Sequence, residues 1–178
     1  MCVSCLSNKD QKFISLAKEH ACKNENYYTT RLAALLVVGK RVVSVGYNQE
    51  KTHPFQTRFQ RHEDAVFLHA ETDAINKAIK ELGLERASRE EISKAFKKAT
   101  LYIYRVKSPG LRYSRDDSRS PMVSGLAKPC AGCEQAIRYY GINRVVYSVN
   151  CEVKENERNN YKLLGQLSQR VHADEAYF

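Results

Sequence analysis

Hydrophobic positions along the chain follow two patterns, and together they predict nine elements. Apolar residues recur three or four positions apart in the helical segments, as Ala74, Ala78 and Leu82 do. Other segments are short apolar runs that favour strands. The predicted order is helix, strand, strand, helix, helix, strand, helix, strand, helix, over residues 8–22, 32–38, 42–47, 70–82, 88–96, 100–106, 130–140, 144–149 and 161–171.

Polar residues and glycines mark the ends of these segments. Asn8 is the expected N-cap of the first helix, and Ser88 with Glu91 has the spacing of a capping box. Gly83 can end the helix before it. Gly39 and Lys40 follow the first apolar run as a two-residue link, and the next apolar positions begin at Val42, which predicts a β-hairpin.

Strands that alternate with helices indicate an α/β sandwich with a partly parallel sheet. The 178 residues fit one domain, with a tail over 1–7 and a helical extension over 152–178. Two segments of about 20 residues, 49–68 and 107–128, show no clear periodicity. They are longer than ordinary connections, and long loops in a compact domain are often functional.

Composition narrows the classes of protein. No apolar run approaches the ~20 residues that span a bilayer. The N-terminus has no basic region followed by an apolar stretch, so we expect no secretory signal and a cytoplasmic location. A net charge of +9 favours solubility or attraction to phosphate, on a nucleotide or on a polymer. The six cysteines, in a reducing compartment, favour metal binding or catalysis over disulfides.

Two short motifs each precede or open a predicted apolar helix. His69 and Glu71 begin one, and Pro129 precedes the Cys130-x-x-Cys133 pair of the other. A Cys-x-x-Cys pair alone could be a redox pair or two buried thiols. At positions i and i+3 the two cysteines lie on one side of a helix turn, where the helix dipole favours thiolates. With the His69 imidazole they make three zinc ligands, which leaves a fourth position for water, as in catalytic zinc sites.

Glu71 is the candidate catalytic residue. Within a helix, residues two positions apart point ~200° apart. We therefore expect His69 and Glu71 at a loop-to-helix junction, where both side chains can face one pocket. There a carboxylate can take a proton from water and pass it to a substrate nitrogen. The alternative is a solvated glutamate favoured by the helix dipole.

The His-x-Glu and Pro-Cys-x-x-Cys motifs resemble those of the zinc-dependent cytidine and deoxycytidylate deaminase superfamily. The stretches 46–54 and 67–75 resemble those of small phage and bacterial deoxycytidylate deaminases. The resemblance implies a three-layer α/β/α sandwich with a central mixed sheet of the cytidine deaminase-like type. It also implies one catalytic Zn²⁺ on His69, Cys130 and Cys133, Glu71 as proton shuttle, and a homo-oligomer.

The same resemblance suggests where substrate would bind. Asn48 matches an asparagine that commonly bonds the substrate sugar, and Ala70 could face the base. Either residue could instead be structural, as a turn or packing residue. Lys51, His53 and Arg115 lie in the two long loops and are further candidate substrate contacts, although ordinary surface loops have the same composition. Lys128, before Pro129, departs from many relatives and could meet a phosphate.

The sequence alone leaves three hypotheses for the function. The leading hypothesis is hydrolytic deamination of a cytosine nucleotide, dCMP to dUMP with release of ammonia, in pyrimidine metabolism. A nucleic-acid deaminase acting on tRNA or single-stranded DNA is the alternative enzyme, for which the basic charge is mild support. A non-catalytic zinc-binding module is the third, and the intact Glu71 argues against it. A second, structural zinc on Cys2, Cys5, His20 and Cys22 is a minor hypothesis.

Overall fold

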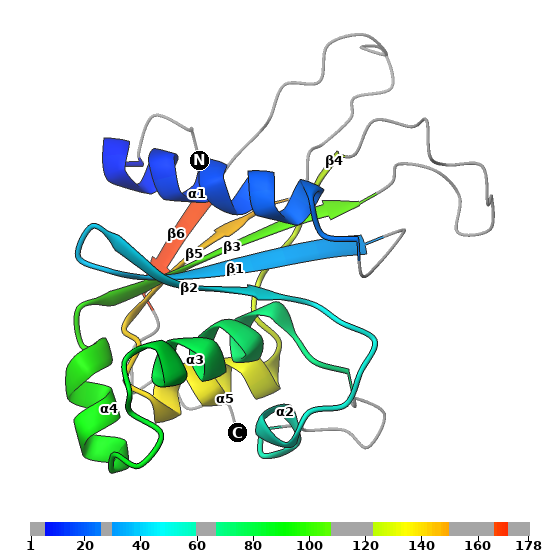
Figure 1. The fold of residues 1–178 in the computed structure, drawn as a ribbon. Coiled ribbons are helices and arrows are strands. Elements are labelled where there is room, and N and C mark those ends of the chain that lie inside the picture. Colours follow the sequence, from blue (N-terminus) through cyan, green and yellow to red (C-terminus); the bar gives the residue numbers. More distant parts are fainter. Residues whose placement is uncertain (1–5, 26–29, 60–66, 108–122, 150–165, 171–178) are drawn as a thin grey trace, which may run out of the picture.

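The computed structural model describes residues 6–25, 30–59, 67–107, 123–149 and 166–170. Its helices and strands are interspersed along the chain (Figure 1). They are α1 (Asn8–Cys22), β1 (Thr30–Val38), β2 (Arg41–Tyr47), α2 (Pro54–Thr57), α3 (Ala70–Glu81), α4 (Arg89–Phe96), β3 (Ala99–Lys107), β4 (Val123–Gly125), α5 (Ala131–Tyr139), β5 (Arg144–Ser148) and β6 (Gln166–Arg170). None of the described helices is both long and apolar enough to cross a bilayer.

The strands form one mixed sheet in the order β2–β1–β3–β5–β6. The β3–β5 pair is parallel, the other pairs are antiparallel, and β4 pairs with the end of β3. Helix α1 covers one face, and α3, α4 and α5 cover the other (Figure 1). Two apolar clusters fill the spaces between the layers, one centred on Phe13 and Tyr102 and one on Ile75 and Ile137. The expected three-layer α/β/α sandwich with a central mixed sheet is confirmed.

Several elements differ from the sequence prediction. Residues 166–170 pair with β5 as a strand, where the spacing predicts a helix over 161–171. That strand has one apolar residue in five, so local periodicity is weak there, and pairing with β5 decides its conformation. The first helix is capped by Ser7, whose hydroxyl accepts from the Asp10 amide, one residue before the expected Asn8. The Ser88–Glu91 capping box is confirmed.

Helix α3 packs unusually closely on β2. Gly46 makes this possible, because a Cβ there would lie 2.2 Å from the Ala70 carbonyl oxygen. The Ser44 hydroxyl donates to the Ala74 carbonyl at 2.7 Å. Two α3 side chains reach the outer edge of β2: Asp73 accepts from the Tyr47 amide at 2.9 Å, and Lys77 Nζ donates to the Val45 carbonyl at 3.1 Å. The start of α3 is therefore fixed against the sheet.

On the opposite face a buried charge joins α1 to the sheet. The Asp10 carboxylate accepts two hydrogen bonds from the Arg144 guanidinium, at 2.6 and 2.8 Å, and one from the Tyr102 hydroxyl at 2.7 Å. Burial alone would raise the pKa of Asp10, but the bonds from Arg144, Ser7 and Tyr102 outweigh it and hold that pKa well below its usual range. The carboxylate therefore stays ionised and ties α1 to β3 and β5.

Candidate metal centre

The three candidate ligands converge between the first turns of α3 and α5. His69 Nδ1 lies 3.5 Å from Cys130 Sγ and 3.3 Å from Cys133 Sγ. His69 and Cys130 are the N-cap residues of their helices, both with extended backbone, and neither side chain makes a capping hydrogen bond. Positions where a side chain usually caps the helix therefore present a ring nitrogen and a thiol to one another.

The arrangement fits one tetrahedral zinc ion. With zinc bonds of ~2.3 Å to sulfur and ~2.0 Å to nitrogen, the nitrogen and sulfur atoms would lie about 3.5 Å apart. The observed separations of 3.3 and 3.5 Å match that geometry. All three ligand atoms lie within 4.8 Å of one another, and this is the one such group of His, Cys, Asp and Glu in the described part of the chain. Three ligands leave one position open, as catalytic zinc sites require.

The electrostatics of the two cysteines also favour a metal. A hydrogen bond from Cys133 lowers the pKa of Cys130 to about 3, while that bond and burial raise the pKa of Cys133 well above its usual value. The lowered pKa favours the thiolate form of Cys130, which is the form that zinc binds. A hydrogen bond to Cys130 raises the pKa of His69. A dication can replace protons on the ligands, because zinc binds the deprotonated forms.

Glu71 lies in the first turn of α3, beside the ligands, and is 4% exposed. Burial raises the pKa of its carboxyl group, partly offset by the charge of His69. A raised pKa makes the carboxylate a better proton acceptor, as a general base in catalysis needs to be. The loop-to-helix junction expected for His69 and Glu71 is present, since His69 is extended and Glu71 is helical.

A cavity of about 300 Å³ opens onto these residues. The buried Ala70 and Glu71 form its floor, and Phe67 and Leu126, which are 46% and 42% exposed, mark its mouth. His69 and Cys130 also line it. The remaining lining residues are Thr30, Leu32, Asn48, Leu68, Arg105, Ala127 and Lys128. A cavity of this size with polar groups at its floor suits a small planar ligand.

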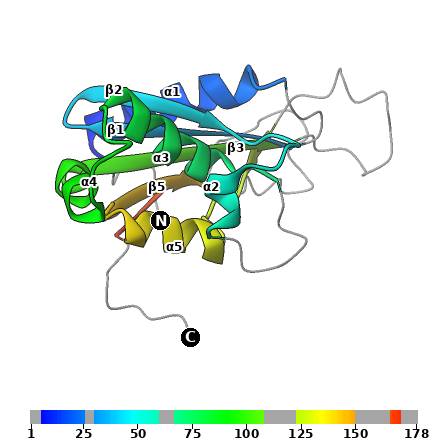
Figure 2. The ribbon, with the colours of Figure 1, turned by 60° about the horizontal axis from the view of Figure 1, so that its bottom comes forward.

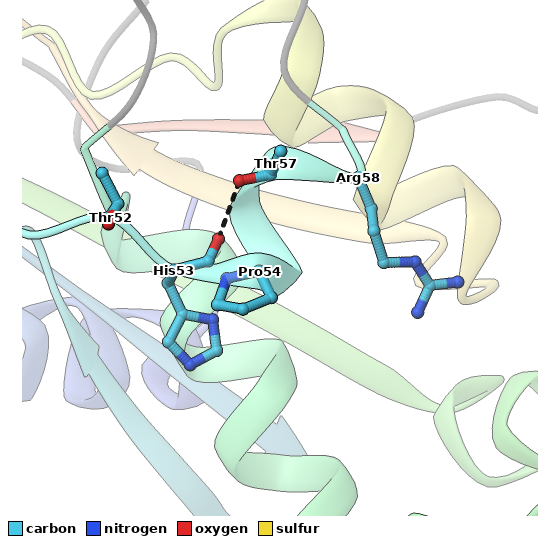
Figure 3. Close-up of a pocket in the computed structure, with 5 residues that line it drawn as sticks. All are labelled: Thr52, His53, Pro54, Thr57 and Arg58. Carbon is cyan, nitrogen blue, oxygen red and sulfur yellow. Dashed lines mark hydrogen bonds between the residues drawn. The ribbon is translucent and has the colours of Figure 1, made fainter.

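The predicted substrate contacts divide into three groups. Asn48 and Ala70 line the cavity, as expected. Lys51 and His53 are not among its lining residues, and Arg115 lies outside the described residues. Figure 3 shows His53 at the start of α2, in a separate hollow with Thr52, Pro54, Thr57 and Arg58. There its ring accepts from the Phe55 amide at 3.1 Å and its carbonyl from the Thr57 hydroxyl at 3.2 Å, so it acts as a helix cap.

Asn48 also has a structural role, the alternative that the sequence left open, although its hydrogen-bond partners could not be read from the sequence. Its side-chain oxygen accepts from the Leu32 amide at 2.7 Å and from Asn24 Nδ2 at 2.8 Å, and its amide donates to the Thr30 carbonyl at 3.1 Å. These bonds join the end of β2 to β1 and α1. Both acceptor sites of the side chain are therefore used within the protein, and a substrate sugar could engage at most its remaining N–H.

Other parts of the site could not be found from local spacing. Phe67, Leu126 and Arg105 come from three separate segments, and only the fold brings them to one cavity. Lys128 was a candidate because it precedes Pro129, and it does line the cavity. The minor second metal site falls partly outside the described residues, which exclude Cys2 and Cys5.

Comparison with known proteins finds one matching family and several solved structures of low sequence identity. The protein-family model described as the cytidine and deoxycytidylate deaminase zinc-binding region matches residues 7–149. No match is found among curated protein sequences. Solved structures similar to this chain include the dCMP deaminase of cyanophage S-TIM5 in complex with dCMP and dUMP, at 16% identity and TM-score 0.45, over 81% of this chain and 84% of that one.

Two other solved structures are less similar. A tRNA:A34 deaminase that edits the wobble position of transfer RNA has 21% identity and TM-score 0.39, over 78% of this chain and 73% of that one. The RibD protein of Acinetobacter baumannii has 19% identity and TM-score 0.39, over 79% of this chain and 28% of that one.

Proposed function

Because this chain belongs to the cytidine and deoxycytidylate deaminase zinc-binding family, we propose that it deaminates a cytosine nucleotide, with dCMP as the substrate. One water is consumed, the bond between ring carbon and exocyclic nitrogen breaks, and dUMP and ammonia are released. The observation that carries the proposal is the buried Glu71 beside His69, Cys130 and Cys133, at the floor of a cavity with two cations in its lining.

Each residue has a role in this proposal. His69, Cys130 and Cys133 hold the zinc ion, which when bound supplies a Lewis acid that makes water a better nucleophile. Glu71 takes a proton from the attacking water on its carboxylate. It delivers this proton to the ring nitrogen, then takes the second proton of the same water and delivers it to the leaving amine, so that the oxygen stays on the ring carbon as the product carbonyl. Burial keeps the carboxyl away from bulk water, so the proton passes between Glu71 and substrate rather than to solvent.

The cavity lining supports a nucleotide over a free base. Lys128 is exposed and Arg105 is half-buried, and both can bond phosphate oxygens. Phe67 and Leu126 place apolar surface at the mouth, where a base or a sugar would pass. Asn48 contributes through its remaining N–H. The proposal includes no substrate contact from Lys51, His53 or Arg115.

The alternative activity is deamination of tRNA or single-stranded DNA, which the net charge of +9 favours. An enzyme that neutralises several phosphates of a polymer substrate loses affinity for it steeply as salt rises, with a slope of about −0.7 per phosphate contact on a single strand. A mononucleotide meets few cations and should show a shallow salt dependence.

The test is a substrate panel assayed for ammonia and for the deaminated product. It contains deoxycytidine, dCMP, dCTP and a short deoxycytidine oligonucleotide, each at two salt concentrations. We expect the fastest turnover with dCMP, and a loss of at least ~10²–10⁴ in turnover for Glu71→Gln with zinc retained. Turnover of the oligonucleotide alone, with a steep salt slope, would replace dCMP by the polymer. Near-native turnover by Glu71→Gln would contradict the role of Glu71.

A further inference from the structure

The short helix α2 lies in the first of the two long segments without periodicity, between β2 and α3. It is fixed against α5 by aromatic packing. The Phe55 ring stacks on Tyr140, with ring centroids 5.6 Å apart and an angle of 10° between the planes. Phe59 packs edge-on against the same ring and against Tyr139. Figure 2 shows α2 beside α5 at this side of the molecule.

The other side of α2 reaches the start of α3 through one buried amide. Gln56 is 1% exposed, and its Oε1 accepts from the backbone N–H of His69 at 3.3 Å. The same oxygen accepts from the Thr72 hydroxyl, which lies in the first turn of α3 and also approaches the His69 carbonyl at 3.0 Å. His69 has no side-chain cap of its own. A residue from another helix therefore supplies the acceptor that α3 lacks at its N-terminus.

These contacts connect His69, at the start of α3, with the two cysteines at the start of α5, by way of α2. Cys130 and Cys133 belong to α5, α5 holds α2 through Tyr140, and α2 holds the backbone of His69 through Gln56. The separation between the His69 ring and the two sulfur atoms thus depends on where α2 places the His69 backbone. We propose that α2 is a brace between α3 and α5 and that Gln56 is the positioning residue for the metal ligand His69. The inference rests on the metal role of His69 proposed above, but not on the identity of the nucleotide.

The test compares zinc affinity across three variants of the full-length protein. Gln56→Met keeps the length of the side chain and removes the acceptor, whereas Gln56→Glu keeps an acceptor oxygen. Gln135→Met makes the same Gln-to-Met change at an exposed position on α5. Zinc dissociation constants come from competition with a chromophoric chelator, and the visible spectrum of the Co²⁺-substituted protein reports the ligand geometry. Thermal unfolding is measured with and without metal.

We expect Gln56→Met to weaken zinc binding by about 10- to 100-fold, the range for residues that orient a metal ligand, and to change the cobalt spectrum. Gln56→Glu should recover most of the affinity, and Gln135→Met should bind zinc as the unchanged protein does. A Gln56→Met protein that is less stable but keeps unchanged zinc affinity and cobalt spectrum would overturn the proposal, because Gln56 would then only support the fold.

One further variant tests the proposal if Gln56→Met does not fold. Thr72→Val removes one of the two groups that Gln56 accepts from and leaves the His69 contact in place, so we expect a smaller but measurable loss of zinc affinity. Unchanged affinity and an unchanged spectrum in Thr72→Val would count against the brace. A protein that binds zinc as expected and deaminates no cytosine nucleotide would refute the proposed function and leave the role of Gln56 standing.

Discussion

Replacing Gly46 by alanine tests whether the close contact of α3 with β2 holds the metal centre in place. An ideal Cβ at Gly46 would lie 2.2 Å from the Ala70 carbonyl oxygen and 2.3 Å from the Ala74 amide nitrogen. Both atoms are backbone, so no side chain can rotate away. To restore ordinary contacts, α3 must retreat by roughly 1 Å, because packed interiors have no spare volume.

The loss of stability expected for Gly46→Ala follows from the contacts that break when α3 moves away from β2. Overpacking costs about 1–3 kcal/mol, and stretching the Ser44–Ala74 and Tyr47–Asp73 hydrogen bonds adds about 1 kcal/mol each. We therefore expect Gly46→Ala to lower the free energy of unfolding by about 3–5 kcal/mol. Because His69 caps the helix that moves, zinc binding should weaken as well.

Urea unfolding and bound zinc per chain measure the two effects. Gly39→Ala is the matched control, since Gly39 has a φ of 63° and no atom within 4 Å of its ideal Cβ. That substitution should cost about 1–2 kcal/mol in backbone strain, with zinc binding unchanged. If Gly46→Ala costs no more than Gly39→Ala and keeps its zinc, the close contact is not what positions α3.

Three further substitutions have defined outcomes. The pKa of Asp10 is held below its unfolded value, so its bonds stabilise the protein above the unfolded pKa, and this contribution disappears as the pH falls through the folded pKa. Asp10→Asn should therefore cost about 2–4 kcal/mol at neutral pH and reduce the pH dependence of urea unfolding in the acid range. Asn48→Ala should cost about 2–3 kcal/mol, because three hydrogen bonds are lost, and should keep zinc; a loss of turnover without loss of stability would instead indicate a contact with substrate. Lys128→Gln should raise the KM for dCMP and leave turnover of deoxycytidine unchanged, and an equal effect on both would exclude a phosphate contact.

The sequence was most informative where a function needs residues close together in the chain. His69 and Glu71, and Cys130 and Cys133, have spacings that a helix start imposes, and the structure brings the three ligands within bonding distance of one ion. Apolar periodicity similarly predicted α3, because its buried face is continuous along the helix.

Residues that depend on tertiary contacts were missed for a physical reason. Gln56 has a role only because α2 packs on α5, and no local pattern marks a buried glutamine that accepts from another helix. The sequence marks His53 as a loop residue and a candidate substrate contact, and only the structure shows that, as the residue before Pro54, it caps a four-residue helix. No sequence pattern singles out Phe67, and its exposure at the cavity mouth appears only in the fold.

The contacts of Asp73 and Lys77 with the outer backbone of β2 also bear on aggregation. An edge strand with free N–H and C=O groups is a template to which another chain can add a strand. The Tyr47 N–H and the Val45 C=O are already bonded by α3 side chains, which hinders such addition along this part of the edge. Helix α3, which begins after His69, thus also protects the edge of the sheet. A variant that loosens α3 should expose the backbone of β2 to pairing with another chain and lose metal at the same time. Such variants would be lost to precipitation as well as to inactivity, which couples solubility to an intact metal centre.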